Sequence, residues 1–186
     1  QQFKMKFSFG ILSLLAVVLC WWSIIAVDGQ QAPVQTFKRG HRNRVEYIKA
    51  EIKKQHLDKG TSTNQKTRAY AQGMGSRNDD AGHLIAQRLG GTGRDTYNII
   101  PQNKNINRGS WRNQVEAKIY NEVKAGNTVV FEVWPKYKTP TATRPNAIVY
   151  QAKKSNGQTV LKKNTIQNPP SSPPKGRGGS KGGKRG

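Results

Sequence analysis

The sequence predicts an α+β domain in which a central antiparallel sheet is flanked by helices. One stretch repeats an apolar side chain every four residues, at Trp111, Val115, Ile119 and Val123. This spacing is typical of a helix that buries one face. Residues 128–137, "TVVFEVWPKY", are rich in β-branched and aromatic residues and predict a strand. Residues 146–163 predict two further strands joined by a turn at Asn156-Gly157.

The first 29 residues have the composition of a secretory signal peptide. Lys4 and Lys6 form a basic start, and residues 7–27 are almost wholly apolar. We expect cleavage after Gly29 and therefore a secreted, extracellular protein. Cleavage would also remove Cys20, the single cysteine of the chain. A membrane-spanning helix is the alternative, because the apolar stretch has about the length that crosses a bilayer.

Residues 30–60 are expected to form an exposed leader and then an amphipathic helix. Within "RVEYIKAEIKKQHL" (44–57), apolar side chains stand at Val45, Ile48, Ile52 and Leu57. We interpret this spacing as helical. The main domain is expected over residues 61–166. Near its start, "KTRAYAQGMG" (66–75) predicts a strand that ends at its two glycines.

The later elements have clear stop signals. The long helix is expected to begin near Gly109 and to stop at Gly126-Asn127. The strand that follows is expected to end at Pro135. Residues 167–186 are expected to form a disordered tail, because this stretch is made mostly of Pro, Gly, Ser and basic residues. The tail either only solubilises the protein or makes salt-sensitive contacts to phosphates.

The chain is strongly basic, with 32 Lys and Arg against 10 Asp and Glu and a net charge of +22. A charge of this size favours polyanionic partners such as nucleic acid, heparin-like glycans or an anionic membrane. It does not separate a nuclease from a histone-like binder or a cationic defence protein. A zinc site is disfavoured, since the chain has neither a cysteine group nor a histidine cluster.

Two motifs carry candidate chemistry. The first is "DDAGH" at residues 79–83, and the second is "YNIIPQNKNINRGSWRNQVE" at residues 97–116. Taken alone, His83 is a core histidine, a metal ligand or a catalytic base. The second motif is rich in amides and opens the best amphipathic helix of the chain. A single Asn in such a loop would indicate only a turn or a cap.

Together the two motifs resemble the signature of the DNA/RNA non-specific endonuclease family. That signature is Asp-Arg-Gly-His, followed by Asn-Ile-x-Pro-Gln, Asn-x-Gly-x-Trp and a helix with a Glu. This chain has "DAGH" at 80–83, "NIIPQ" at 98–102 and "NRGSW" at 107–111. The resemblance covers residues 79 to about 150. It implies a ββα-metal (His-Me finger) core.

The resemblance also implies a role for each matching residue. His83 would be the general base that deprotonates water, a role that suits a group whose pKa lies near neutral pH. Asn107 would bind Mg²⁺ through its amide oxygen, with Mn²⁺ able to substitute. Glu116 would support the water shell of the metal, and Asp80 would orient the loop of His83.

Six other residues complete the predicted site. The basic residues expected to bind substrate phosphates are Arg88, Arg108 and Arg112. The residues expected to fix the local structure are Gly82, Asn98 and Gln102. Of these, Gly82 is expected to allow a backbone conformation or a close approach that a Cβ would block.

Two departures from the family signature affect the site. Ala81 stands where the common form has Arg, which removes one cation. Eight residues separate Asn107 from Glu116 where the family usually has seven, and one extra residue turns an α-helical side chain by about 100°. Gln114 is then the alternative for the glutamate role. Otherwise Glu116 pairs with Arg112 or Lys118 on a solvated face.

The resemblance implies an Mg²⁺-dependent endonuclease that acts on DNA and RNA, and the expected signal peptide implies that it is secreted. Contacts to the phosphate backbone rather than to bases would leave little sequence preference. No stable membrane association is expected after signal cleavage, and an inhibitor protein is left open. The alternative is a nuclease-fold protein that has lost catalysis and binds nucleic acid or other polyanions. A membrane-active defence protein is disfavoured, because no strongly apolar amphipathic helix is predicted.

Overall fold

The computed structural model describes residues 32–172. The expected signal peptide and most of the expected tail lie outside these described residues. No helix between residues 32 and 172 is long and apolar enough to span a bilayer.

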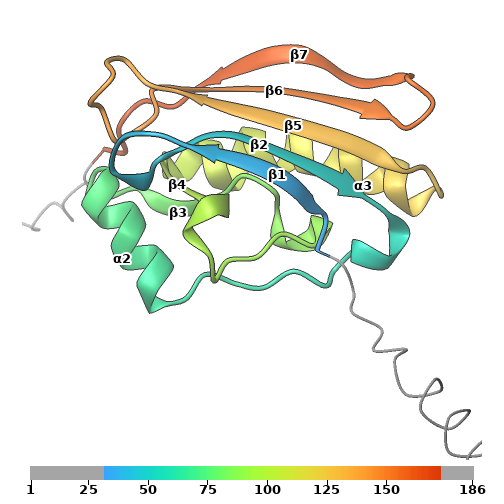
Figure 1. Cartoon of the computed structure of the whole chain (residues 1–186), viewed down its shortest axis with the longest axis horizontal. Helices are drawn as coiled ribbons and strands as arrows, with labels where there is room; N and C mark the ends of the chain where they lie inside the picture. The colour runs from blue at the N-terminus through green and yellow to red at the C-terminus, as the bar shows by residue number, and fades with distance from the viewer. Residues whose placement is uncertain (1–31, 173–186) are drawn as a thin grey trace, which may run out of the picture. The chain divides into compact units, whose positions relative to one another are not determined.

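A five-stranded antiparallel sheet forms the larger part of the domain (Figure 1). Its strands are β1 (Val34–Arg39), β2 (Val45–Ile52), β5 (Val129–Lys136), β6 (Ala147–Lys154) and β7 (Thr159–Gln167), in the order β1-β2-β5-β6-β7. Each neighbouring pair is antiparallel.

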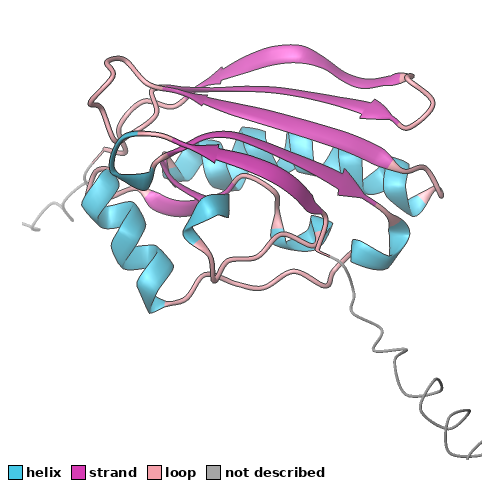
Figure 2. Cartoon of the chain, in the orientation of Figure 1, coloured by secondary structure: helices cyan, strands magenta, loops and turns pink. Residues whose placement is uncertain are grey.

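The second part of the domain is a smaller β-pair with helices (Figure 2). Its elements are the antiparallel strands β3 (Asp80–His83) and β4 (Ile99–Gln102), the helix α2 (Gln65–Met74), and a π-helix (Ile106–Glu116) that continues as α3 (Ala117–Lys124). Short 3₁₀ turns occur at His41–Asn43, Lys54–His56, Gln87–Leu89 and Thr96–Asn98. The order β3, β4, π-helix gives the ββα unit that the resemblance implied.

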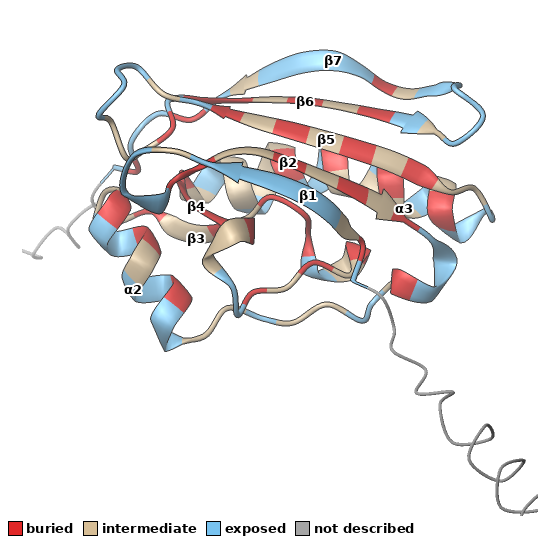
Figure 3. Cartoon of the chain, in the orientation of Figure 1, coloured by how far each residue is buried: buried red, intermediate tan, exposed pale blue. Residues whose placement is uncertain are grey.

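The core lies between the five-stranded sheet and the long helix (Figure 3). Alternate residues of β5 are buried and belong to this core, at Val129, Phe131 and Val133. The whole predicted helical stripe, from Trp111 to Val123, is also fully buried. Burial on one face only is the usual condition of antiparallel sheets. The predicted α+β fold with an antiparallel sheet and flanking helices is confirmed.

The glycine signals identified the later turns correctly, whereas the proline stop signal did not. Gly157, between β6 and β7, has φ 89°, and Gly126, after α3, has φ 98°. These are left-handed conformations that glycine adopts at little cost. Pro135 is not the end of its strand, because β5 extends one residue further to Lys136.

The helix predicted over residues 44–57 is wrong. The stretch forms β2, in which Ile48, Ala50 and Ile52 are buried in strict alternation. Ala50 faces Phe131 in the register with β5. The leader also contains a strand, β1, so residues 30–60 are not separate from the main domain but supply two strands of its sheet.

The strand predicted at residues 66–75 is also wrong, because α2 occupies this stretch. Asn64 caps the helix by accepting a hydrogen bond from the Thr67 N–H at 2.9 Å. Thr67, Ala71 and Met74 are the buried residues of the helix, and their spacing places them on one side. After His83, where β3 ends, the next element is the 3₁₀ turn at Gln87–Leu89.

The start of the predicted tail is packed against the domain. Asn168 is fully buried, and Ser171 is 7% exposed. The prediction of a disordered tail from residue 167 is therefore wrong for residues 168–171.

Candidate active site

The predicted functional residues meet in one cleft. It has a volume of about 430 Å³ and is lined by Asp58, His83, Ala86, Gln87, Arg88, Asn107, Arg108, Arg112 and Glu116. The β3–β4 pair contributes the histidine, and the helix after β4 contributes the asparagine and the glutamate. Residues from separate motifs thus share one solvent-facing site.

His83 is held in one tautomer by a backbone carbonyl. Its Nε2 lies 3.0 Å from the Thr61 oxygen. A carbonyl can only accept, so Nε2 carries the proton and Nδ1 keeps a free lone pair. Burial lowers the pKa of His83 below its ordinary value of 6.5, and the hydrogen bond to Thr61 opposes this shift. The neutral side chain can therefore act as a proton acceptor.

Asn107 is oriented by Asp80. The Asn107 Nδ2 donates to the Asp80 Oδ2 at 3.1 Å. With the amide nitrogen engaged there, Oδ1 is the atom left to bind a ligand. An amide oxygen is a hard donor of the kind that Mg²⁺ accepts in proteins.

Asp80 binds two residues of the cleft, Asn107 and Arg108. Its two carboxylate oxygens also accept from Nε and an Nη of Arg108, both at 2.8 Å. The Arg108 side chain is otherwise 69% exposed. Asp80 was expected to orient the loop of His83, but its side chain fixes Asn107 and Arg108 instead.

The spacing between Asn107 and Glu116 is accommodated by the π-helix. Residues nine apart point to opposite sides of an α-helix, which has 3.6 residues per turn. A π-helix takes more residues per turn, because its hydrogen bonds join residues five apart. Here the Ala117 N–H donates to the Arg112 oxygen, which is a bond of this kind. Asn107 and Glu116 both line the cleft, whereas Gln114 is exposed and lies outside its lining.

The donor set fits a divalent cation. Burial raises the pKa of Glu116 to about 7, although Arg88 and Arg112 act in the opposite direction. A cation bound beside Asn107 would favour the charged carboxylate. Residues 32–172 contain no group of three or more His, Cys, Asp or Glu that could hold a metal. The donors that the resemblance assigns to the cation, the Asn107 amide oxygen and the Glu116 carboxylate, both line this cleft.

All three predicted arginines line the cleft, and one of them is held in place by residues that the sequence did not reveal. The Arg88 guanidinium lies 4.0 Å from the ring centre of Tyr120. The Tyr120 hydroxyl donates to the Asp58 Oδ2 at 2.8 Å. Tyr120 follows Glu116 by four residues, and this spacing on a helix was a usable signal. Asp58 and the Thr61 carbonyl lie in irregular loops and gave no such signal.

The three predicted support residues lie behind the cleft. Asn98 is fully buried and pairs with the backbone of Ile85, accepting from its N–H and donating to its oxygen, both at 2.8 Å. The Asn98 side chain therefore makes the two hydrogen bonds to Ile85 that the backbone of a neighbouring strand would otherwise make, two residues after His83. Gln102 is fully buried and packs directly over Gly82, where an added Cβ would lie 2.0 Å from the Gln102 Oε1.

Gly82→Ala is expected to destabilise the domain by about 1–3 kcal/mol, because the added Cβ would overlap the fully buried Gln102 at both Oε1 and Cβ, 2.0 and 2.7 Å away. Thermal unfolding of the single variants and of Gly82→Ala/Gln102→Ala measures the effect. The double variant should be more stable than additivity predicts, since shortening Gln102 removes the closest contact, at Oε1, and leaves only the contact at the Gln102 Cβ, 2.7 Å from the added Cβ. Additive losses would contradict this account of Gly82.

The chain matches known proteins over most of its length. A family model described as DNA/RNA non-specific endonuclease matches residues 26–156. The chain is 34% identical over 143 residues to the probable deoxyribonuclease RhsA of Dickeya dadantii. That alignment covers 77% of this chain but only 9% of the relative.

Two solved structures of NucA from Streptococcus agalactiae are also similar. The metal-free form has a TM-score of 0.54 and 20% identity, and covers 74% of this chain and 71% of that one. The magnesium-bound form has a TM-score of 0.55 and 19% identity, and covers 78% and 74%. These structures share the α+β fold. The family match over residues 26–156 shows that the chain belongs to the DNA/RNA non-specific endonuclease family.

Proposed function

We propose that this chain is a secreted, Mg²⁺-dependent endonuclease that hydrolyses DNA and RNA without sequence specificity. The observation that carries the proposal is the meeting of His83, Asn107 and Glu116 in one cleft with three arginines. Secretion is supported by the signal-like composition of residues 1–29. DNA as a substrate is supported by the relative described as a probable deoxyribonuclease.

The cleft residues supply the groups that phosphodiester hydrolysis needs. Nδ1 of His83 takes a proton from water as the water oxygen attacks phosphorus. The bond between phosphorus and the 3′ oxygen then breaks, and the 3′ oxygen takes a proton from solvent water, which leaves a 5′-phosphate and a 3′-hydroxyl. Asn107 would hold the Mg²⁺ ion, and Glu116 would accept hydrogen bonds from its waters. When bound, the ion stabilises charge on the phosphate and on the leaving oxygen.

Arginines around the cleft would bind the backbone of the substrate. Arg88 and Arg112 lie near Glu116, and Arg108 is fixed by Asp80. Such contacts go to phosphates, so they carry no base sequence information. They also offer cations at a site where Ala81 replaces the arginine of the common signature. A binder without catalysis would use the same arginines, so cleavage and not binding separates the two functions.

A substrate panel tests the proposal. Circular plasmid, single-stranded DNA and RNA are incubated with the purified chain in Mg²⁺ or in EDTA. We expect all three to be cut in Mg²⁺ and none in EDTA, with loss of supercoiled plasmid as the sign of internal cleavage. Binding of the three nucleic acids without any Mg²⁺-dependent cleavage would overturn the proposal and favour the non-catalytic binder.

Salt is expected to weaken cleavage steeply. With about three phosphate contacts, kcat/KM should fall roughly 10- to 100-fold between about 50 and 200 mM monovalent salt. The measurement uses initial rates below saturation at constant Mg²⁺. A flat response would contradict binding through phosphates.

The acid limb of the pH–rate profile is expected to have its midpoint below pH 6.5. Burial lowers the pKa of His83, so the neutral base persists below its ordinary range and is lost only as the pH falls through the lowered pKa. The measurement is kcat/KM against pH at saturating Mg²⁺. Glu116→Gln should keep the same midpoint at a lower rate, although the pKa of Glu116 is raised to about 7. A midpoint that moves with this variant would assign the limb to Glu116 instead.

A further inference from the structure

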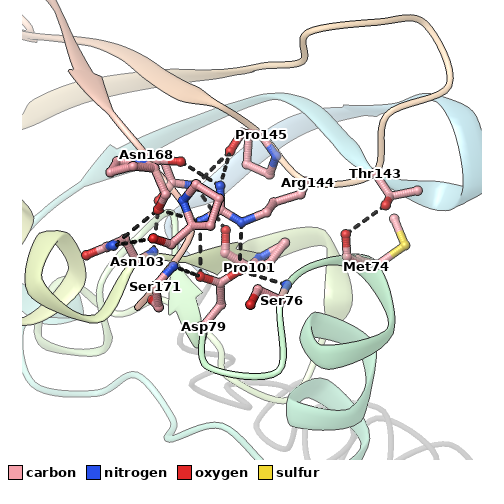
Figure 4. Close-up of polar contacts among 12 residues, drawn as sticks. Met74, Ser76, Asp79, Pro101, Asn103, Thr143, Arg144, Pro145, Asn168 and Ser171 are labelled. Carbon is pink, nitrogen blue, oxygen red and sulfur yellow. Dashed lines mark hydrogen bonds and ion pairs between the residues drawn. The ribbon is translucent and has the colours of Figure 1, made fainter. Parts of the chain in front are cut away.

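The chain does not leave the domain at the end of β7. Residues 168–171, which we name the anchor segment, form a polar network with three other parts of the chain (Figure 4). The side-chain Nδ2 of Asn168 donates to the backbone oxygens of Pro101 and Pro145, at 3.1 and 2.8 Å. The family match ends at residue 156, so the anchor segment lies outside the matched region.

One set of contacts holds the turn that precedes the π-helix. The Asn103 N–H donates to the Asn168 Oδ1 at 2.8 Å, and the Asn103 side chain donates to the Pro169 oxygen at 3.1 Å. The Lys104 N–H donates to the Ser171 Oγ at 3.1 Å. Consecutive backbone amides of this turn are thus bound by the anchor segment.

This turn leads directly to Asn107. The Asn107 N–H donates to the Asn103 oxygen at 2.8 Å. The Asn103 side-chain oxygen also accepts from the N–H groups of Asn105 and Ile106. The backbone at Asn107 is therefore bound to Asn103, and Asn103 is in turn bound by Asn168.

A second set of contacts holds Asp79, the residue before Asp80. Asp79 is buried and accepts from Arg144 Nε at 2.7 Å and from the Ser171 N–H at 3.3 Å. Arg144 in turn donates to the Pro169 oxygen at 2.8 Å. Asp79 immediately precedes Asp80, the residue that orients the Asn107 amide.

We propose that the anchor segment positions Asn107 for metal binding, with Asn168 and Ser171 as positioning residues. The proposal rests on the function proposed above. The anchor segment is connected to Asn107 in two ways. It binds Asn103, whose backbone oxygen accepts from the Asn107 N–H. It also binds Asp79, which precedes the residue that orients the Asn107 side chain. Partners that orient a metal ligand commonly change metal affinity by about 10- to 100-fold when removed.

Two variants of the full chain test this positioning role. Asn168→Ala removes the acceptor for the Asn103 N–H, and Ser171→Ala removes only the acceptor for the Lys104 N–H. Amide hydrogen exchange at Asn107, measured without metal, should become faster in both. Mn²⁺ affinity, measured by water-proton relaxation without nucleic acid, should fall on the order of 10-fold for Asn168→Ala and less for Ser171→Ala.

Leu161→Ala is the matched control, because Leu161 is buried in the core on β7 and lies outside the anchor segment and the cleft. It should lower the melting temperature while Mn²⁺ affinity and Asn107 exchange stay at wild-type values. The proposal is overturned if both anchor variants behave like this control. A wild-type chain that binds Mn²⁺ but cuts no nucleic acid would instead overturn the proposed function, and both readouts would still test the anchor segment.

Discussion

Replacing His83 with alanine is expected to lower kcat by about 10²- to 10⁴-fold, the usual contribution of a general base. The side chain offers a free lone pair at Nδ1 because Nε2 is committed to the Thr61 oxygen. Alanine leaves no group to take the proton from water. The measurement is the single-turnover rate of plasmid cleavage at saturating Mg²⁺.

His41→Ala is a matched control for this variant. His41 is exposed and does not line the cleft, so its replacement should leave the cleavage rate unchanged. Circular dichroism of His83→Ala should match the wild type, since one hydrogen bond to a loop is lost. Wild-type rates in a folded His83→Ala variant would exclude His83 as the base.

Asn107→Ala is expected to lower cleavage by about 10²- to 10³-fold at a fixed, moderate Mg²⁺ concentration. The variant removes the amide oxygen left free by the hydrogen bond to Asp80. Loss of a metal that stabilises the phosphate charge costs several kcal/mol, and each 1.36 kcal/mol is about tenfold in rate. The rate measured against Mg²⁺ concentration should show a higher half-saturation point.

Asn105→Ala provides the comparison for Asn107. Asn105 is exposed and lies outside the lining of the cleft. Its replacement should leave both the rate and the Mg²⁺ half-saturation point unchanged. An Asn107→Ala variant with wild-type Mg²⁺ dependence would show that the metal is held elsewhere.

The elements predicted correctly were those with agreeing local signals. Gly157 and Gly126 mark turns that only a few residue types adopt without strain. The helical stripe was confirmed as well, because all of its members face one core. Such signals depend on neighbours in sequence, so they can be identified without knowing the fold.

The errors fell where the tertiary structure chose between two local patterns. Ile48 and Ile52 are four residues apart, a spacing that suits a helix, but they are also members of the alternating set with Ala50. Pairing with β5 stabilises this stretch as a strand. At α2, the Asn64 cap was a local helix signal that the two glycines obscured.

The site was predictable in its residue types but not in its register. The resemblance supplied His83, Asn107 and Glu116 as candidates, yet an α-helix would have turned Glu116 away. The four-residue spacing from Trp111 to Val115 continues unchanged into α3 at Ile119 and Val123, so it gave no sign of the π-helix. The contacts of Asn168 with Pro101 and Asn103 join residues more than sixty positions apart, and no local pattern predicts them.

The most direct test of the proposed mechanism compares plasmid cleavage by wild type and His83→Ala, each in Mg²⁺ and in EDTA. The result we predict is cleavage by wild type in Mg²⁺ alone, with His83→Ala reduced to near the EDTA level. Equal cleavage by the two proteins in Mg²⁺, or cleavage by wild type that survives EDTA, would contradict it.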